Sequence, residues 1–347
     1  MKAVVLASLI GVLLIGTSSE AQAPGKWIKR APFPEPSEEL VGASVGGKFY
    51  VFGGLGPGWV PQGFVYEYDP PTDKWTKKKP MALPAHHVAF SEVNGKVYAF
   101  GGFVPPESGP PAWVPINNAW EYDPMNDSWM ALAPMPTKRG SAVAATVNGK
   151  IYVTGGAAVH PGSSEPALGP ARPHQSVATV EEYDPKTNTW SERSSMPTAR
   201  NHAAVGAVND KIYVIGGRLG GAFIFTASNT NVVEVYDPAI DQWGAVKTRM
   251  PTERSGGAWG VHNGRIYVAG GEQQDGDLMA AFRALEAYDP AINTWAELPM
   301  MPIPRHGLAG AVVGDRLYLA SGDVQSAGIP GMHLVTEAHD AFEFVDR

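Results

Sequence analysis

The feature that most constrains this chain is a unit that recurs about every 50 residues and ends in two consecutive glycines. The glycine pairs lie at 53–54, 101–102, 155–156, 216–217 and 270–271, and Ser321 with Gly322 forms a sixth, degenerate copy. Each pair follows a segment such as Lys-Phe-Tyr-Val-Phe at 48–52 or Arg-Leu-Tyr-Leu-Ala at 316–320. Alternating apolar residues after a turn are typical of the second strand of a hairpin. The repeat therefore predicts an all-β propeller with six blades.

Two aromatic residues complete the repeated unit. A third strand-like segment carries the sequence Tyr-Asp-Pro, and a fourth carries a tryptophan a few residues later. These residues are Tyr68, Tyr122, Tyr183, Tyr236 and Tyr288, followed by Trp75, Trp129, Trp190, Trp243 and Trp295. Large rings with one polar atom suit the space between neighbouring sheets, so we expect a structural role for them.

The two ends of the repeat array predict how the ring closes. The last unit has a third strand at 341–345, but the chain stops before a fourth. Near the other end, Trp27 precedes Pro-Phe-Pro at 32–34 with the same spacing that separates Trp129 from Pro-Met-Pro at 134–136. An N-terminal strand is therefore expected to complete the last blade and close the propeller.

Charge and composition exclude several classes of function. The chain has 27 Lys and Arg against 34 Asp and Glu, a net charge of −7, and no basic run, so a nucleic-acid partner is not expected. It contains no cysteine, which excludes disulfides, thiol nucleophiles and a lipid-modified cysteine. Residues 1–23 have a positive start, an apolar core and an Ala-Gln-Ala cleavage pattern, as in a secretory signal peptide. Residues 24–347 would then form one secreted or periplasmic propeller of bacterial type, with no membrane span after cleavage.

The glycine pair, the tyrosine and the downstream tryptophan resemble the kelch repeat, over roughly residues 25 to 347. Kelch propellers include protein-binding modules, galactose oxidase-type enzymes and N-acetylneuraminate epimerase-type enzymes, so the resemblance implies the architecture and leaves the chemistry open. A copper-radical oxidase of this family needs a tyrosine joined to a cysteine, and the absence of cysteine excludes that cofactor.

Candidate functional residues come from aligning the six units just before their first strands. If the first strand leaves one face and the second returns to it, these residues share a face with the loops after the glycine pairs. They would then surround the mouth of the central channel. The first equivalent position holds Ser37, Ala85, Arg139, Arg200, Arg254 and Arg305. The second holds Glu38, His86, Gly140, Asn201, Ser255 and His306. The third holds Glu39, His87, Ser141, His202, Gly256 and Gly307.

Converging guanidinium groups predict recognition of an anion. The expected ligand-binding residues are Arg139, Arg200, Arg254, Arg305, Arg218, His86 and His306. Bonding of the arginines to carbonyls or acidic groups at blade junctions is the structural alternative. Long loops after Gly102 and Gly156 would wall the mouth into a pocket, unless they are simple insertions at an exposed site.

Two functions remain open from the sequence. The first is an exported binding module for an anionic small molecule, a glycan or a protein partner. The second is a cofactor-free epimerase or mutarotase of an acidic sugar, in which arginines hold the carboxylate. Its proton-transfer residues would be Glu38, Glu39, His87 and His202. No cofactor is expected. A plain copper or zinc site is left open as the weaker alternative for His86, His87, His202 and His306, because the histidines show no His-x-His or His-Glu-x-x-His spacing.

Overall fold

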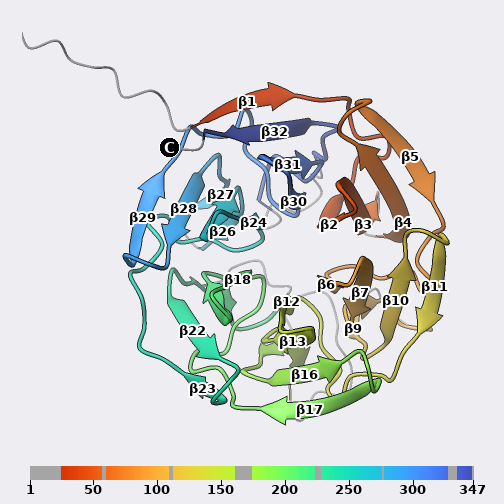
Figure 1. Ribbon diagram of the computed structural model, residues 1–347, viewed down its shortest axis with the longest axis vertical. Helices are drawn as coiled ribbons and strands as arrows, with labels where there is room; N and C mark the ends of the chain where they lie inside the picture. The colour runs from red at the N-terminus through yellow and green to blue at the C-terminus, as the bar shows by residue number, and fades with distance from the viewer. Residues whose placement is uncertain are drawn as a thin grey trace, which may run out of the picture.

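The computed structural model describes residues 25–56, 60–108, 112–160, 174–222, 228–275, 277–326 and 334–345. Six four-stranded sheets surround a central axis like the blades of a propeller (Figure 1). The described residues are all-β, with no helix among their elements and hence none that could cross a membrane. The signal peptide expected at 1–23 lies outside the described residues and stays a prediction.

Each blade is antiparallel, and its first strand is nearest the axis. The first blade consists of β2 (Glu38–Val45), β3 (Lys48–Gly56), β4 (Val60–Asp69) and β5 (Lys74–Lys78). The second consists of β6 (Ala89–Val93), β7 (Lys96–Phe100), β10 (Ala119–Asp123) and β11 (Ser128–Ala131). The third consists of β12 (Val143–Val147), β13 (Lys150–Thr154), β16 (Val180–Asp184) and β17 (Thr189–Arg193). The fourth consists of β18 (Ala204–Val208), β19 (Lys211–Ile215), β22 (Val233–Asp237) and β23 (Gln242–Trp243). The fifth consists of β24 (Ala258–His262), β25 (Arg265–Ala269), β28 (Leu285–Asp289) and β29 (Thr294–Glu297). The sixth is β30 (Ala309–Val313), β31 (Arg316–Ala320), β32 (His339–Phe344) and β1 (Gly25–Lys29).

The sixth blade confirms the predicted closure. Strand β1 pairs antiparallel with β32, with Trp27 opposite Phe342. The two rings lie 5.2 Å apart between centroids, and Trp27 Nε1 donates a hydrogen bond of 2.8 Å to the carbonyl of Pro299 in the fifth blade. The two ends of the chain therefore complete one sheet, and the inner strands β2 and β30 contact each other across the closed ring.

The repeated aromatic residues hold the outer part of each blade together, as expected. In five blades the tyrosine of the third strand faces the tryptophan of the fourth, with ring centroids 4.9 Å apart for Tyr68 and Trp75. The Tyr68 hydroxyl donates to Asp73 at 2.5 Å, and Trp75 Nε1 donates to the Ala31 carbonyl at 3.0 Å. The other tryptophans likewise donate to a carbonyl of the preceding blade. These contacts bury the rings and satisfy their polar atoms at once, which stabilises both blade and junction.

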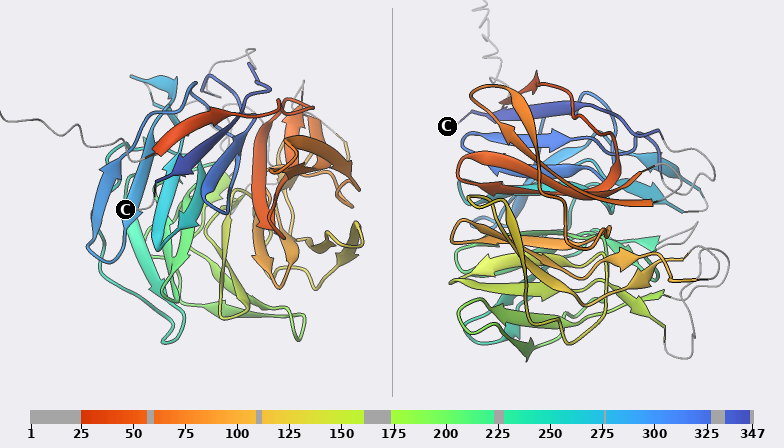
Figure 2. Two further views of the ribbon diagram at one scale, coloured as in Figure 1. Left: turned by 45° about the horizontal axis from the view of Figure 1, so that its top comes forward. Right: turned by 90° about the vertical axis from the view of Figure 1, so that its right-hand side faces the viewer.

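Short accessory hairpins follow four of the glycine pairs. They are β8 (Phe103–Val104) with β9 (Val114–Pro115), β14 (Ala157–Val159) with β15 (His174–Ser176), β20 (Arg218–Leu219) with β21 (Ser228–Asn229), and β26 (Glu272–Gln274) with β27 (Met279–Ala281). Backbone bridges such as His86 to Phe103 and Asn201 to Arg218 join them to the residues before the inner strands. The predicted sharing of one face is thus confirmed, and Figure 2 shows short strands of the accessory hairpins on one side of the disc. We call it the mouth face.

Candidate functional site

An open ring of backbone hydrogen bonds runs around the channel at the mouth face and links the second blade, through the third to the sixth, to the first. The third equivalent position adopts positive φ in all six blades, between 52° and 64°. The amide of His202 donates to the carbonyl of Ser141, and Ser141 in turn donates to His87, at 3.0 and 2.9 Å. The series continues from blade to blade, because the amide of Gly256 donates to His202, that of Gly307 to Gly256, and that of Leu40 to Gly307. Left-handed backbone costs a non-glycine residue on the order of 1 kcal/mol, so this ring fixes strained residues where their side chains meet.

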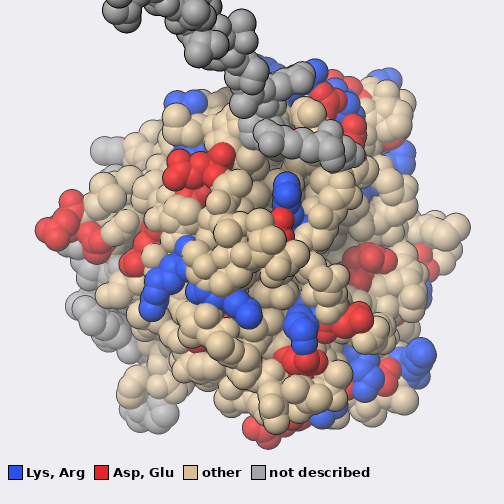
Figure 3. All heavy atoms as spheres, turned by 60° about the vertical axis from the view of Figure 1, so that its left-hand side comes forward, with Lys and Arg blue, Asp and Glu red and all other residues tan. Residues whose placement is uncertain are grey.

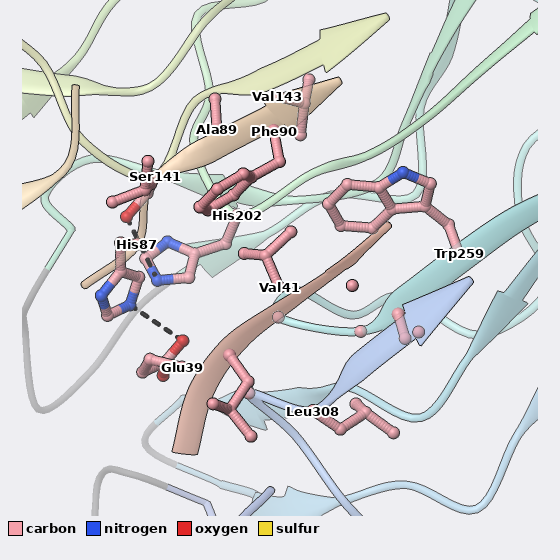
Figure 4. Close-up of a pocket in the computed structure, with 18 of the residues that line it drawn as sticks. Glu39, Val41, His87, Ala89, Phe90, Ser141, Val143, His202, Trp259 and Leu308 are labelled. Carbon is pink, nitrogen blue, oxygen red and sulfur yellow. Dashed lines mark hydrogen bonds and ion pairs between the residues drawn. The ribbon is translucent and has the colours of Figure 1, made fainter. Parts of the chain in front are cut away.

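Below this ring lies a small central cavity. Its volume is about 70 Å³, and apolar side chains including Val41, Phe90 and Trp259 form its walls. Figure 4 shows Glu39, His87, Ser141 and His202 gathered at one end of these walls. The cavity is small and is not fully enclosed.

Three of the expected catalytic residues lie together at the mouth. Glu39 Oε2 is 3.0 Å from His87 Nε2, and the rings of His87 and His202 are 4.7 Å apart between centroids. Burial alone would raise the pKa of Glu39, but the charge and hydrogen bonding of His87 outweigh it and hold that pKa below its ordinary value. Burial, helped by the charge of Arg218, lowers the pKa of His202 well below its usual range. The cluster therefore combines a carboxylate with a neutral imidazole.

A second polar cluster surrounds His306. Its Nε2 atom lies 3.7 Å from Glu38 and 3.8 Å from both Glu39 and Glu272. Burial would lower the pKa of His306, but the carboxylates of Glu272, Glu39 and Glu38 together raise it to about 9. This imidazolium thus neutralises part of the acidic charge under the mouth, and since it is fully buried it does not contact a ligand at the rim.

The prediction of an arginine-lined mouth is wrong. Arg139, Arg200, Arg254 and Arg305 are at most 2% exposed. Each guanidinium turns into its own blade, where it bonds to backbone carbonyls and to one carboxylate. The pairs are Arg139 with Glu181, Arg200 with Glu234, Arg254 with Glu286 and Arg305 with Asp340, at 2.8, 2.5, 2.5 and 2.8 Å. Buried charges of this kind are retained when they are paired and hydrogen-bonded, which is the structural alternative for this position.

The other expected ligand-binding residues are also committed to internal contacts. Arg218 lies on the loop side, but it is buried and donates to Glu272 and to the Ala222 carbonyl, both at 2.6 Å. His86 is buried against Trp113, with ring centroids 4.7 Å apart. The anion-binding role expected of these groups is therefore not supported. The epimerase alternative also loses the guanidinium clamp on which it depended.

Some residues of the site do not stand out in the sequence. Glu272 and Asp323 directly follow the fifth and sixth glycine pairs, the position that Arg218 occupies in the fourth blade. Extending the alignment of equivalent positions to this residue would have identified both acidic groups. Asn201 contacts His202 through its side chain and stands at an aligned position. Its side chain is uncharged, so the search for charged groups did not select it as a candidate. Trp113 and His174 come from long loops, and their contact with each other and with Phe103 shows that these loops pack together.

Comparison with known proteins identifies the repeat. The family model for the Kelch motif matches residues 40–82, 84–136 and 138–197, and the model for the KLHDC2/KLHL20/DRC7 Kelch-repeats domain matches 169–322. This chain belongs to the kelch family. It is a six-bladed kelch propeller, as the sequence predicted.

The curated relatives match only part of this propeller and are longer than it. Kelch-like protein terF of Aspergillus terreus is 30% identical over 217 residues, which are 61% of this chain and 44% of that protein. Beta-scruin of Limulus polyphemus is 30% identical over 219 residues, 60% of this chain and 22% of that protein. The chain thus spans less than half the length of these curated relatives. A solved structure titled "Structure of YjhT" has a TM-score of 0.70 and 20% identity, covers 89% of this chain and 95% of that one, and shows the fold alone.

Proposed function

We propose that this kelch propeller is a binding module that engages a protein partner through its mouth face. The observation that carries the proposal is a group of exposed apolar side chains on the loops of this face. Val60, Leu278, Met279 and Leu334 are 55%, 44%, 39% and 49% exposed. They belong to the first, fifth and sixth blades, which are neighbours in the closed ring. Exposed apolar side chains on neighbouring loops can be buried against a partner and serve as anchors of a protein interface.

The size of the central cavity supports a partner that rests on the rim. With a volume of about 70 Å³, the cavity is small beside the loops that surround it. The loops around it are therefore the larger contact surface. They are joined to the rigid ring through backbone bridges, so the partner would meet a largely preformed surface.

The charge of the site favours a partner with a cationic group. Glu39 faces the cavity, while Glu38 and Glu272 lie behind it, and the expected arginines are turned inward. Elsewhere the charges are mixed: on the face drawn in Figure 3, Lys and Arg alternate with Asp and Glu. A lysine or arginine of the partner above the mouth would meet the carboxylate of Glu39, and this replaces the anion expected from the sequence.

The experiment compares two matched triple variants. The first, Val60→Ser with Leu278→Ser and Met279→Ser, removes apolar side chains from the mouth face. The second, Met125→Ser with Ile240→Ser and Ile292→Ser, removes exposed apolar side chains from the turns of the opposite face. The unmodified protein is used to capture and identify a partner, and the dissociation constant of that purified partner is then measured for all three proteins.

We expect the mouth-face variant to weaken binding by at least about tenfold, since a total loss of about 1.4 kcal/mol from the three side chains is sufficient for this. The opposite-face variant should bind like the unmodified protein. Equal affinities for both variants, or a loss confined to the opposite-face variant, would remove the proposal.

A further inference from the structure

Glu39, His87 and His202 converge on the mouth from the first, second and fourth blades. We propose that these three side chains hold one divalent transition-metal ion, with Zn²⁺ as the best match. A carboxylate and two imidazoles are ligands that zinc accepts in proteins, and three protein ligands leave a position open for water or a bound group. The site goes beyond partner binding and does not depend on it, and an ion bound there would occupy Glu39 in place of the partner's cationic group.

The distances suit such an ion after small side-chain rotations. The candidate ligand atoms of the three residues all lie within 4.8 Å of one another. With metal–ligand bonds of about 2.1 Å, tetrahedral geometry places ligand atoms about 3.4 Å apart. Glu39 Oε2 and His87 Nε2, at 3.0 Å, are already near this separation.

Asn201 orients His202 as a metal ligand. The Asn201 amide nitrogen donates to Ser176 Oγ at 2.8 Å and to the carbonyls of Gly220 and Gly221 at 3.3 and 3.4 Å. These contacts direct the Asn201 amide oxygen toward His202 Nδ1, so that this ring nitrogen carries the hydrogen and donates it. In the neutral ring, Nε2 then presents its lone pair, and Ser141 Oγ lies 3.5 Å from that atom. An acceptor behind a histidine is the usual companion of metal ligation.

His87 presents the same ring atom to the same place. Its Nδ1 lies 2.6 Å from His86 Nδ1, so the hydrogen of that contact is shared with a buried neighbour. Its Nε2 is buried and lies 3.0 Å from the Glu39 carboxylate. A cation between Nε2 and the carboxylate would satisfy both atoms.

The backbone gives the site rigidity that loop residues usually lack. All three residues have φ between 52° and 54°, and the hydrogen-bonded ring joins their blades. Because the ligands come from separate blades, they lie far apart in the sequence and form no short spacing motif. A chain without zinc-type spacing can therefore still bring three ligands together.

The test titrates Zn²⁺ into the full-length protein after chelator treatment, using calorimetry, and records the visible absorption of Co²⁺ as an independent readout. We expect one ion per chain. The variants His87→Gln and His202→Gln should abolish this binding, and Asn201→Leu should weaken it by roughly 10- to 100-fold. The matched control is His262→Gln, which removes an imidazole at the far end of β24.

Thermal melting without metal shows whether each variant is folded, and only folded variants are compared. Binding retained by folded His87→Gln and His202→Gln proteins would overturn the proposal. So would an unmodified protein that binds no ion, or a His262→Gln protein that loses the ion to the same extent. An octahedral Co²⁺ spectrum that the histidine variants leave unchanged would also contradict it.

Discussion

Arg254 shows how a residue that resembles a ligand-binding group becomes part of the blade. Its guanidinium donates to Glu286, to the carbonyls of Thr252 and Val268, and through Nε to that of Gly270. Burial lowers the pKa of Arg254, and the charge of Glu286 acts in the opposite direction. All of its donor groups are thus used inside the protein, and none is left for an anion.

The sequence contains the signal for this pairing. In the four blades with arginine, an acidic residue stands two positions before the aromatic residue of the third strand, as Glu286 does before Tyr288. In the two blades without arginine, the same position is aromatic: Ser37 goes with Tyr66, and Ala85 with Trp120. A comparison of the two positions across the repeats would therefore have predicted the buried ion pairs in place of an open mouth.

We expect Arg254→Ala to lower the free energy of unfolding by about 3–5 kcal/mol, because it leaves Glu286 buried without its partner. The double variant Arg254→Met with Glu286→Leu should recover most of this loss. Urea denaturation measures both, and Arg265→Ala is the control, since the exposed Arg265–Asp289 pair should contribute less than about 1 kcal/mol. A cost below about 1 kcal/mol for Arg254→Ala would contradict the structural role.

At the scale of elements, β1 and the accessory hairpins differ in how clearly the sequence predicts them. Strand β1 carries a tryptophan at the repeat spacing, which predicts it as the missing strand of the last blade. The hairpins β20–β21 and β26–β27 have strands of two or three residues, too short for a periodic pattern. Contacts to the rigid ring, which appear only in three dimensions, fix their positions.

An engineered disulfide tests the closure of the ring. Lys26 and Glu343 face each other across β1 and β32, and the natural chain has no cysteine that could interfere. We expect Lys26→Cys with Glu343→Cys to oxidise readily and to stabilise the protein by on the order of 4 kcal/mol, since the bond closes a very long loop.

Denaturation with and without reductant measures this stabilisation. The off-register pair Lys26→Cys with Val345→Cys serves as control and should oxidise more slowly. Equal oxidation of both pairs would contradict the register of β1 against β32.

At the scale of the whole molecule, the number of blades, the closure and the shared face follow from the repeat, because each unit folds into the same sheet and packs on its neighbours in the same way. Alignment of the repeats likewise predicts that Glu39, His87 and His202 share one mouth, which the cavity lining confirms. Side-chain direction could not be obtained in this way. Whether a residue at the mouth turns into its blade, as Arg139 does, or toward the axis, as His87 does, depends on partners in other strands.

The proposed function assigns opposite roles to the two faces of the disc. The mouth face carries the accessory hairpins, the polar cluster and the exposed apolar side chains of neighbouring blades. The opposite face also exposes apolar side chains, among them Met125 and Ile240, but they lie on short turns with no accessory hairpin. A protein partner should therefore cover one face and leave the other open to solvent.

Hydrogen exchange of the propeller with and without its captured partner tests this claim most directly. We predict that the partner slows exchange in the β26–β27 hairpin, at the start of β4 and around Leu334, while the turns at Met125, Ile240 and Ile292 exchange as before. Protection confined to those opposite turns, with the mouth-face hairpins unchanged, would contradict it.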